Sequence, residues 1–143
     1  MVKPQPPAAK LQPANPAHTP APTVLPAKPE PLAVNAPGAI PATAEQHNTL
    51  GRQLSAAGRY REAIAELTEA LRIAPDFALA FNARGFAWFK LHDWPWALKD
   101  LNQAIRLNPK YVNAYRIRAF VRKSMGDARG AVADLKKSQR LAR

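Results

Sequence analysis

The chain has 143 residues, no cysteine and a formal net charge of +11. Without cysteine, disulfides and thiolate-bound metals are excluded. No apolar run reaches the roughly 18–20 residues of a membrane-spanning helix, and no signal-peptide core of roughly 7–15 apolar residues follows Met1. The expected compartment is cytoplasmic by default, and periplasmic if Met1 stands in place of a removed signal peptide.

Residues 1–43 are expected to form a disordered tail or linker rich in proline and alanine. Proline fixes φ and disfavours a helical conformation in the residue before it. The tail also has little apolar surface to bury, so an extended and partly polyproline-II chain is favoured. The stretches 4–7 (PQPP) and 26–29 (PAKP) resemble minimal polyproline ligands, so a plain linker and a polyproline ligand both stay open.

The rest of the chain contains an internal repeat with a period of 34 residues. The segment 70–89 recurs at 104–123 in the same register. Extending this register divides the chain, with no insertion, into repeats at 44–77, 78–111 and 112–143. A fixed period of this length is typical of stacked helical hairpins.

Each repeat is expected to contain two amphipathic helices joined by a short turn. Apolar side chains recur at helical spacing along both halves of a repeat. The second helices are predicted at 60–73, 94–107 and 128–141. Pro75 and Pro109 follow the first two of these helices and prevent their continuation.

Turn residues and small residues give further expectations. Gly58 and Gly126 are predicted to take the left-handed conformation that ends a helix. Asp93 is predicted to cap the next helix, with Pro95 in its first turn. Small residues at equivalent positions should let paired helices approach closely. They are Gly51, Gly85 and Ala119 on first helices, and Ala63, Ala97 and Ala131 on second helices.

The repeat resembles the tetratricopeptide repeat, whose 34-residue pattern combines Leu-Gly, an aromatic residue, an alanine, a large apolar residue and a proline. The matching residues are Leu50, Gly51, Leu54, Gly58, Tyr60, Ala63, Leu67, Ala70 and Pro75, then Phe81, Gly85, Trp88, Trp94, Ala97, Leu101, Ala104 and Pro109, then Tyr115, Ala119, Gly126, Ala131 and Leu135. The motif is similar to that of bacterial members. The resemblance implies an all-α fold, a right-handed α-solenoid of three antiparallel helix-turn-helix repeats. It also implies a non-catalytic protein–protein interaction module or scaffold that binds a peptide or protein in its concave groove.

In this family the first helices line the concave groove, which implies a set of groove residues in this chain. They are Asn48, Arg52 and Ser55 in the first repeat, Asn82, Phe86, Phe89 and Lys90 in the second, and Asn113, Arg116, Phe120 and Lys123 in the third. Amides can bind a peptide backbone, cations can bind carboxylates, and aromatic rings can contact apolar side chains. The expected partner is therefore a protein or peptide with acidic character. For the three phenylalanines, packing between repeats is an alternative.

Some members of the family clamp the C-terminal carboxylate of a chaperone with lysine, asparagine and arginine side chains. The equivalent places here hold Asn48, Arg52, Ala83, Asn113 and Ile117. Only an amide-plus-cation character is retained, so the resemblance does not imply that particular partner.

The last repeat is strongly basic. The net charge rises from −1 in the first repeat to +3 in the second and +7 in the third. The cations of the third are Arg116, Arg118, Arg122, Lys123, Arg129, Lys136, Lys137, Arg140 and Arg143. With Phe120 available for stacking, binding of nucleic acid or another polyanion is the alternative function. The last helix keeps an apolar stripe of Val132, Leu135 and Leu141, so a self-capped monomer and a weak dimer through this helix both stay open.

Motifs for catalysis or for cofactor binding are absent from the sequence. It has no glycine-rich phosphate loop. His18, His47 and His92 are isolated and lack the spacing of metal ligands. An enzyme, a cofactor and a metal site are therefore not expected. Trp96 has no aromatic counterpart in the other repeats, so it is either an exposed contact residue or packed on a neighbouring helix.

Overall fold

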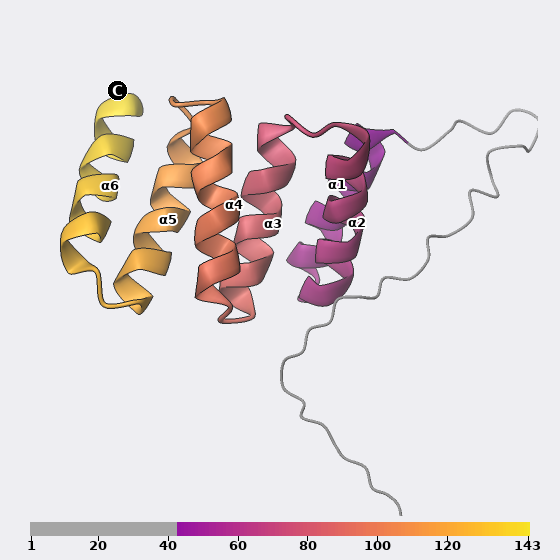
Figure 1. Ribbon diagram of the computed structural model, residues 1–143, viewed down its shortest axis with the longest axis horizontal. Helices are drawn as coiled ribbons and strands as arrows, with labels where there is room; N and C mark the ends of the chain where they lie inside the picture. The colour runs from indigo at the N-terminus through magenta and orange to yellow at the C-terminus, as the bar shows by residue number, and fades with distance from the viewer. Residues whose placement is uncertain (1–42) are drawn as a thin grey trace, which may run out of the picture. The chain divides into compact units, whose positions relative to one another are not determined.

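The computed structural model of the protein describes residues 43–143, which form six α-helices (Figure 1). They are α1 (Ala44–Ala56), α2 (Tyr60–Ile73), α3 (Ala78–Lys90), α4 (Trp94–Leu107), α5 (Val112–Ser124) and α6 (Ala128–Leu141). Apart from Thr43, the tail expected at 1–43 lies outside the described residues. None of these six helices is long and apolar enough to cross a membrane.

The helices form three antiparallel pairs stacked in chain order (Figure 1). α1 packs on α2, α3 on α4 and α5 on α6, and each pair also contacts the first helix of the next. The first helices begin at Ala44, Ala78 and Val112, which keeps the 34-residue period. The predicted all-α solenoid of helix-turn-helix repeats is confirmed.

The second helices have the bounds predicted from the register of the repeat. α2 ends at Ile73, before Pro75, and α4 ends at Leu107, before Pro109. A proline inside either helix would lose a backbone hydrogen bond and clash with the preceding turn. The link to the next pair is therefore short, and each first helix folds back directly onto the second helix before it.

One residue of each turn within a pair is in the left-handed region. Gly58 has a φ of +80° and Gly126 a φ of +89°, as predicted. His92 holds the same place in the second pair with a φ of +63°. This conformation costs a residue with a Cβ roughly 1–2 kcal/mol, so the second turn is the strained one of the three.

Replacing Gly126 with alanine is expected to lower the free energy of unfolding by about 1 kcal/mol, because alanine avoids positive φ. A Cβ at this position meets no atom within 4 Å, so the cost is conformational and not steric. Gly126→Asn should lose less, since asparagine tolerates the left-handed region. Thermal denaturation that shows equal losses for both variants would contradict this explanation.

The helices α4 and α1 begin with different N-cap arrangements. Asp93 is the N-cap residue of α4, but its side chain makes no capping hydrogen bond, so the predicted role of its carboxylate is wrong. Pro95 lies in the first turn of α4, as predicted. Thr43 makes a capping box at α1, in which Thr43 Oγ1 accepts from the Gln46 N–H at 3.2 Å and Gln46 Oε1 accepts from the Thr43 N–H at 2.7 Å. Two backbone donors at the start of the domain are thereby satisfied.

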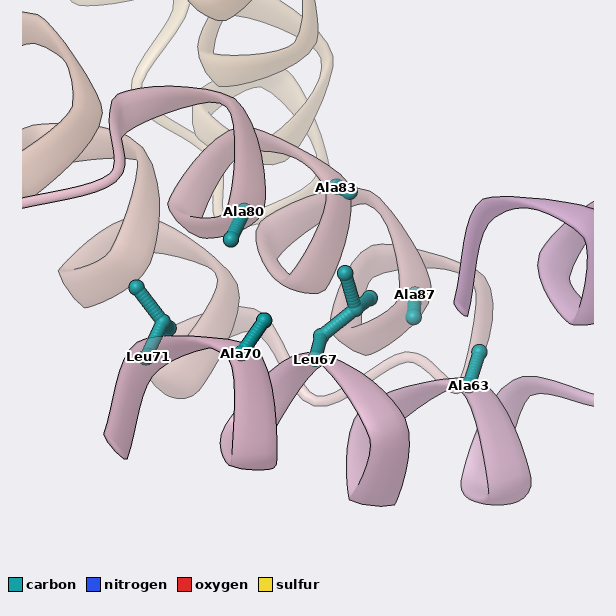
Figure 2. Packing of buried hydrophobic residues seen from close by; sticks show 7 residues of the cluster. All are labelled: Ala63, Leu67, Ala70, Leu71, Ala80, Ala83 and Ala87. Atoms are coloured by element: carbon teal, nitrogen blue, oxygen red, sulfur yellow. The ribbon is translucent and has the colours of Figure 1, made fainter. Parts of the chain in front are cut away.

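Small side chains fill the contacts between neighbouring pairs. Between α2 and α3 the buried residues are Ala63, Leu67, Ala70, Leu71, Ala80, Ala83 and Ala87 (Figure 2). The corresponding cluster between α4 and α5 is Ala97, Leu101, Ala104, Ala114, Ile117 and Val121. Because alanine lets two helix backbones approach closely, the second helix of each pair packs tightly against the first helix of the next pair.

Glycines on the first helices allow the close contact within a pair. A Cβ on Gly51 would lie 2.5 Å from Leu67 Cγ, and a Cβ on Gly85 would lie 2.8 Å from Leu101 Cγ. A Cβ on Gly85 would also lie 3.3 Å from the carbonyl oxygen of Ala97. These separations are shorter than normal carbon contacts, which confirms the predicted role of the small residues in helix pairing.

Two buried ion pairs recur at the same period. Arg84 donates to both carboxylate oxygens of Asp100 at 2.7 and 2.9 Å, and Arg118 donates to both of Asp134 at 2.8 and 2.7 Å. Both carboxylates are almost completely buried. Because a guanidinium matches a carboxylate with two parallel hydrogen bonds, each pair fixes a first helix on its own second helix.

The same arginines also reach back to the preceding repeat. Arg84 Nη1 donates to Thr68 Oγ1 at 3.0 Å, and Arg118 Nη1 donates to Asn102 Oδ1 at 2.8 Å. Each arginine therefore joins three helices. The register of the stack is set by these contacts in addition to the alanine clusters.

Candidate functional site

A groove of about 480 Å³ opens between the first helices of the three repeats, and we call it the central groove. Its lining consists of Arg52, Ser55 and Ala56, then Leu79, Asn82, Ala83 and Phe86, then Tyr111, Asn113 and Ile117. The three segments meet because the 34-residue period turns the same face of α1, α3 and α5 to the same side. A smaller hollow of about 330 Å³ lies between the start of α1 and the link from α2 to α3.

Two buried oxygens in the central groove lack a hydrogen-bond partner among residues 43–143. Asn82 is 6% exposed and Ser55 is 8% exposed, and Asn82 Oδ1 and Ser55 Oγ are both unpaired. A buried polar atom without a partner costs about 1–3 kcal/mol. A ligand N–H or O–H that reached these oxygens would remove that cost.

Tyr111 adds a hydroxyl group at the edge of the central groove. Burial raises the pKa of Tyr111, while the charge of Arg52 and a hydrogen bond with the Asn82 side chain act in the opposite direction. Because the net change is upward, the hydroxyl stays protonated near neutral pH and can donate to a ligand oxygen. Arg52, Asn82 and Tyr111 thus form a polar side of the groove.

Apolar side chains form the other part of the lining. The ring of Phe86 packs edge-on against Tyr60, with centroids 6.5 Å apart, and Lys90 Nζ lies 5.9 Å from the Phe86 centroid. Leu79 is exposed in the groove and Ile117 is buried beneath it. An apolar wall beside a few polar groups suits a ligand that combines an apolar side chain with hydrogen-bonding atoms.

The structure brings together some of the residues that the sequence assigned to the groove. Arg52, Ser55, Asn82, Phe86 and Asn113 line it. The others lie outside its lining, and they are Asn48, Phe89, Lys90, Arg116, Phe120 and Lys123. The assigned set therefore divides into a compact group and a group spread along the same three helices.

The outlying residues have different surroundings. Asn48 is buried on α1, one turn before Arg52, and its Oδ1 is also unpaired among the described residues. Phe89 and Phe120 join α3 to α5 with ring centroids 6.4 Å apart, and Phe89 lies 5.6 Å from Trp94. Phe89 therefore packs between repeats, whereas Phe120 is more than half exposed.

The cations of the last repeat fall into two groups. Arg118 and Arg122 both bind Asp134, with Arg122 Nη1 at 2.9 Å from Asp134 Oδ2. The sequence predicted that both arginines belong to a basic end that binds polyanions, and the structure corrects this by placing them in the contact of α5 with α6. Arg116 and Lys123 are exposed on α5.

Several lining residues were missed or given another role. Leu79 stands on the α3 face of Asn82 and Phe86, so helical periodicity could have found it. Tyr111 lies in the link before α5, so helical periodicity does not assign it to the groove face of that helix. Ile117 occupies one of the places equivalent to the chaperone clamp and lines the groove as an apolar residue.

Trp96 lies apart from the central groove, on α4. Its ring stacks on Trp88 with centroids 5.9 Å apart, and Lys99 Nζ lies 4.8 Å from the Trp96 centroid. The residue is nevertheless about half exposed. The sequence left open whether Trp96 is exposed or packed on a neighbouring helix. Each alternative holds in part, since the ring packs on Trp88 of α3 and the residue still reaches the surface.

Comparison with known proteins identifies the repeat. Residues 51–92 match a family model described as a TPR repeat, and residues 78–111 match one described as the tetratricopeptide repeat. No curated protein matches the sequence.

Solved structures with the same architecture include domains in peptide or protein complexes. The second TPR of Spaghetti (RPAP3) bound to the HSP90 peptide SRMEEVD is 27% identical, with a TM-score of 0.67 over 69% of this chain and 92% of that one. The TPR2B domain of yeast Sti1 in a pHsp70 complex is 26% identical, with a TM-score of 0.66 over 68% and 78%. The Arabidopsis OM64 TPR domain shares the fold at 24% identity, with a TM-score of 0.68 over 69% and 82%.

The helix period, the packing residues and the family models all indicate the same repeat. The helix pairs recur every 34 residues, and glycine and alanine close the contacts within and between pairs. Two repeat models match, one of them over the second repeat, residues 78–111. Residues 51–111 therefore contain tetratricopeptide repeats, and residues 43–143 have the fold of solved domains built from such repeats.

Proposed function

We propose that the chain is a non-catalytic protein–protein interaction module that binds an extended peptide segment of a partner protein in the central groove. The observation that carries this proposal is the pair of unpaired buried oxygens, Asn82 Oδ1 and Ser55 Oγ, beside an apolar wall. The RPAP3 domain bound to an HSP90 peptide and the Sti1 domain in a pHsp70 complex, both on this fold, add support.

The groove offers the groups that an extended peptide needs. A peptide presents backbone N–H groups that can donate to Asn82 Oδ1, and carbonyl groups that can accept from the Tyr111 hydroxyl. One apolar side chain of the peptide would pack on Phe86 and Ile117, which anchors the peptide in register. Backbone contacts supply affinity in this arrangement, and the apolar anchor supplies selectivity.

The electrostatics favour a peptide with acidic residues on either side of the anchor. Arg52 lines the groove, and Lys90, Arg116 and Lys123 are exposed on the same helices. Charges of one sign along a binding surface attract and orient a partner of the opposite sign. The groove nevertheless differs from a carboxylate clamp, because Ile117 replaces a cation with an apolar side chain. An internal apolar anchor is therefore favoured over a terminal carboxylate.

Asn82→Ala is expected to weaken peptide binding about tenfold, because it removes a hydrogen bond to a buried polar group worth about 1–3 kcal/mol. Peptides for this test are selected from a random display library against the full chain, and affinities are measured by fluorescence anisotropy. Gln53→Ala is the matched control, since Gln53 is an exposed amide on α1 outside the lining of the groove and should leave the affinity unchanged.

The same peptides distinguish this proposal from polyanion binding. A complex driven by phosphate contacts loses roughly 10³-fold or more in affinity between about 50 and 200 mM salt, whereas a groove-bound peptide should change only mildly. Unchanged binding in Asn82→Ala, together with displacement of the peptide by an oligonucleotide at low salt, would overturn the proposal in favour of the basic last repeat.

A further inference from the structure

The outer face of α6 shares no residue with the lining of the central groove. This face consists of Val132, Leu135, Lys136 and Gln139. The equivalent faces of α2 and α4 are covered by α3 and α5. Leu67 and Leu101 occupy the place of Leu135 in their repeats and are completely buried. Leu135 is 40% exposed and Val132 is 50% exposed. Among the described residues, α6 thus presents a helix-binding face with no helix on it.

One position on this face differs in charge from its counterparts. Thr68 on α2 and Asn102 on α4 each accept a hydrogen bond from an arginine of the next first helix. Lys136 stands 34 residues after Asn102, at the same position of the third repeat. An ammonium group can only donate, and it repels a guanidinium. A helix that docks here must therefore bring an acceptor in place of the arginine.

We propose that the outer face of α6 binds an amphipathic helix of a partner protein, seated as α3 is on α2 and α5 is on α4. The partner helix carries aspartate or glutamate where α3 and α5 carry Arg84 and Arg118. Small or branched apolar residues on the same stripe contact Val132 and Leu135. The exposed cations Arg129 and Arg140 on α6 add attraction for an acidic helix.

A second copy of this chain does not fit the same face. α3 meets α2 through the small side chains of Ala80, Ala83 and Ala87. The corresponding residues of α1 are polar, larger and exposed, and they are Gln46, Thr49 and Gln53. These side chains would hold the two helices apart. Two α6 faces against each other would bring together like charges at Lys136, which also disfavours a symmetric dimer.

The test uses two synthetic peptides with the sequence of residues 111–125, which forms the helix that docks on α4. Both carry Arg116→Glu and Lys123→Glu, which bring the net side-chain charge of this segment from +4 to zero, and one of them also carries Arg118→Glu, which brings it to −2. We expect the Arg118→Glu peptide to bind the full chain at least about fivefold more tightly than its counterpart. Its glutamate attracts Lys136, whereas the arginine of the counterpart repels Lys136, and a fivefold change in affinity corresponds to about 1 kcal/mol. Backbone amide signals in NMR spectra should move along α6.

Two variants of the chain make the test decisive. Lys136→Asn restores the acceptor found at Asn102 and should reverse the preference between the peptides. Leu135→Asp should abolish binding of both peptides while helicity and binding of a groove peptide stay unchanged, because Leu135 is exposed and does not line the central groove. Equal affinities of the two peptides for the unaltered chain, or a dimer in sedimentation that Leu135→Asp dissolves, would overturn the proposal.

Discussion

Asp134→Ala is expected to lower the free energy of unfolding by about 3 kcal/mol, since removing one partner of a buried ion pair leaves the other charge without compensation. Asp134 accepts hydrogen bonds from both Arg118 and Arg122 and is almost completely buried. For a domain of this size each kcal/mol shifts the melting temperature by roughly 4–8 °C, so the loss should exceed about 10 °C.

The matched control for this variant is Glu62→Ala. Glu62 pairs with Arg59 at 2.6 Å on the exposed surface of α2, and exposed pairs contribute only about 0–1 kcal/mol. Thermal denaturation followed by circular dichroism measures both variants. Similar melting temperatures for Asp134→Ala and Glu62→Ala would show that the buried pairs do not hold the last repeat together.

Gly85→Leu is the second substitution for which we expect a large effect. Its Cβ alone would lie 2.8 Å from Leu101 Cγ and 3.3 Å from a backbone oxygen that cannot move without unwinding α4. Overpacking of this kind costs about 1–3 kcal/mol and outweighs the helix-propensity gain of about 1 kcal/mol from removing a glycine. We therefore expect the melting temperature to fall by several degrees.

Ala65→Leu provides the comparison for Gly85→Leu, because it adds the same side chain at an exposed position in the middle of α2. Surface substitutions of this type stay within about 0.5 kcal/mol. A melting temperature of Gly85→Leu equal to that of Ala65→Leu would mean that the glycine is not needed for the close contact of α3 with α4.

The helices could be predicted well because local signals and the repeat agreed. An uninterrupted period placed every second helix, and Pro75 and Pro109 fixed where two of them end. Gly58 and Gly126 located two of the turns. In the turn of the second pair, His92 takes the left-handed conformation without glycine, and the sequence gives no local sign of it.

The candidate site could be predicted only in part, because its lining depends on contacts between repeats. Asn82 and Phe86 share one face of α3, so helical spacing was sufficient to assign them. Tyr111 reaches the groove from the link before α5, which spacing along a helix does not describe. From the sequence, Arg118 was predicted to be a surface cation of the basic last repeat. Only the fold shows that it binds the buried carboxylate of Asp134.

Binding of a peptide segment in the central groove, between the first helices, is what the proposed function requires. Its most direct test is an NMR titration of the isotope-labelled full chain with a selected peptide, in which the side-chain amide signals of Asn82 are followed together with the backbone signals of Phe86 and Ile117. We predict that these signals move together and follow one saturation curve with the Kd measured by anisotropy. Shifts confined to α6, with the Asn82 side-chain signals unmoved, would contradict the claim.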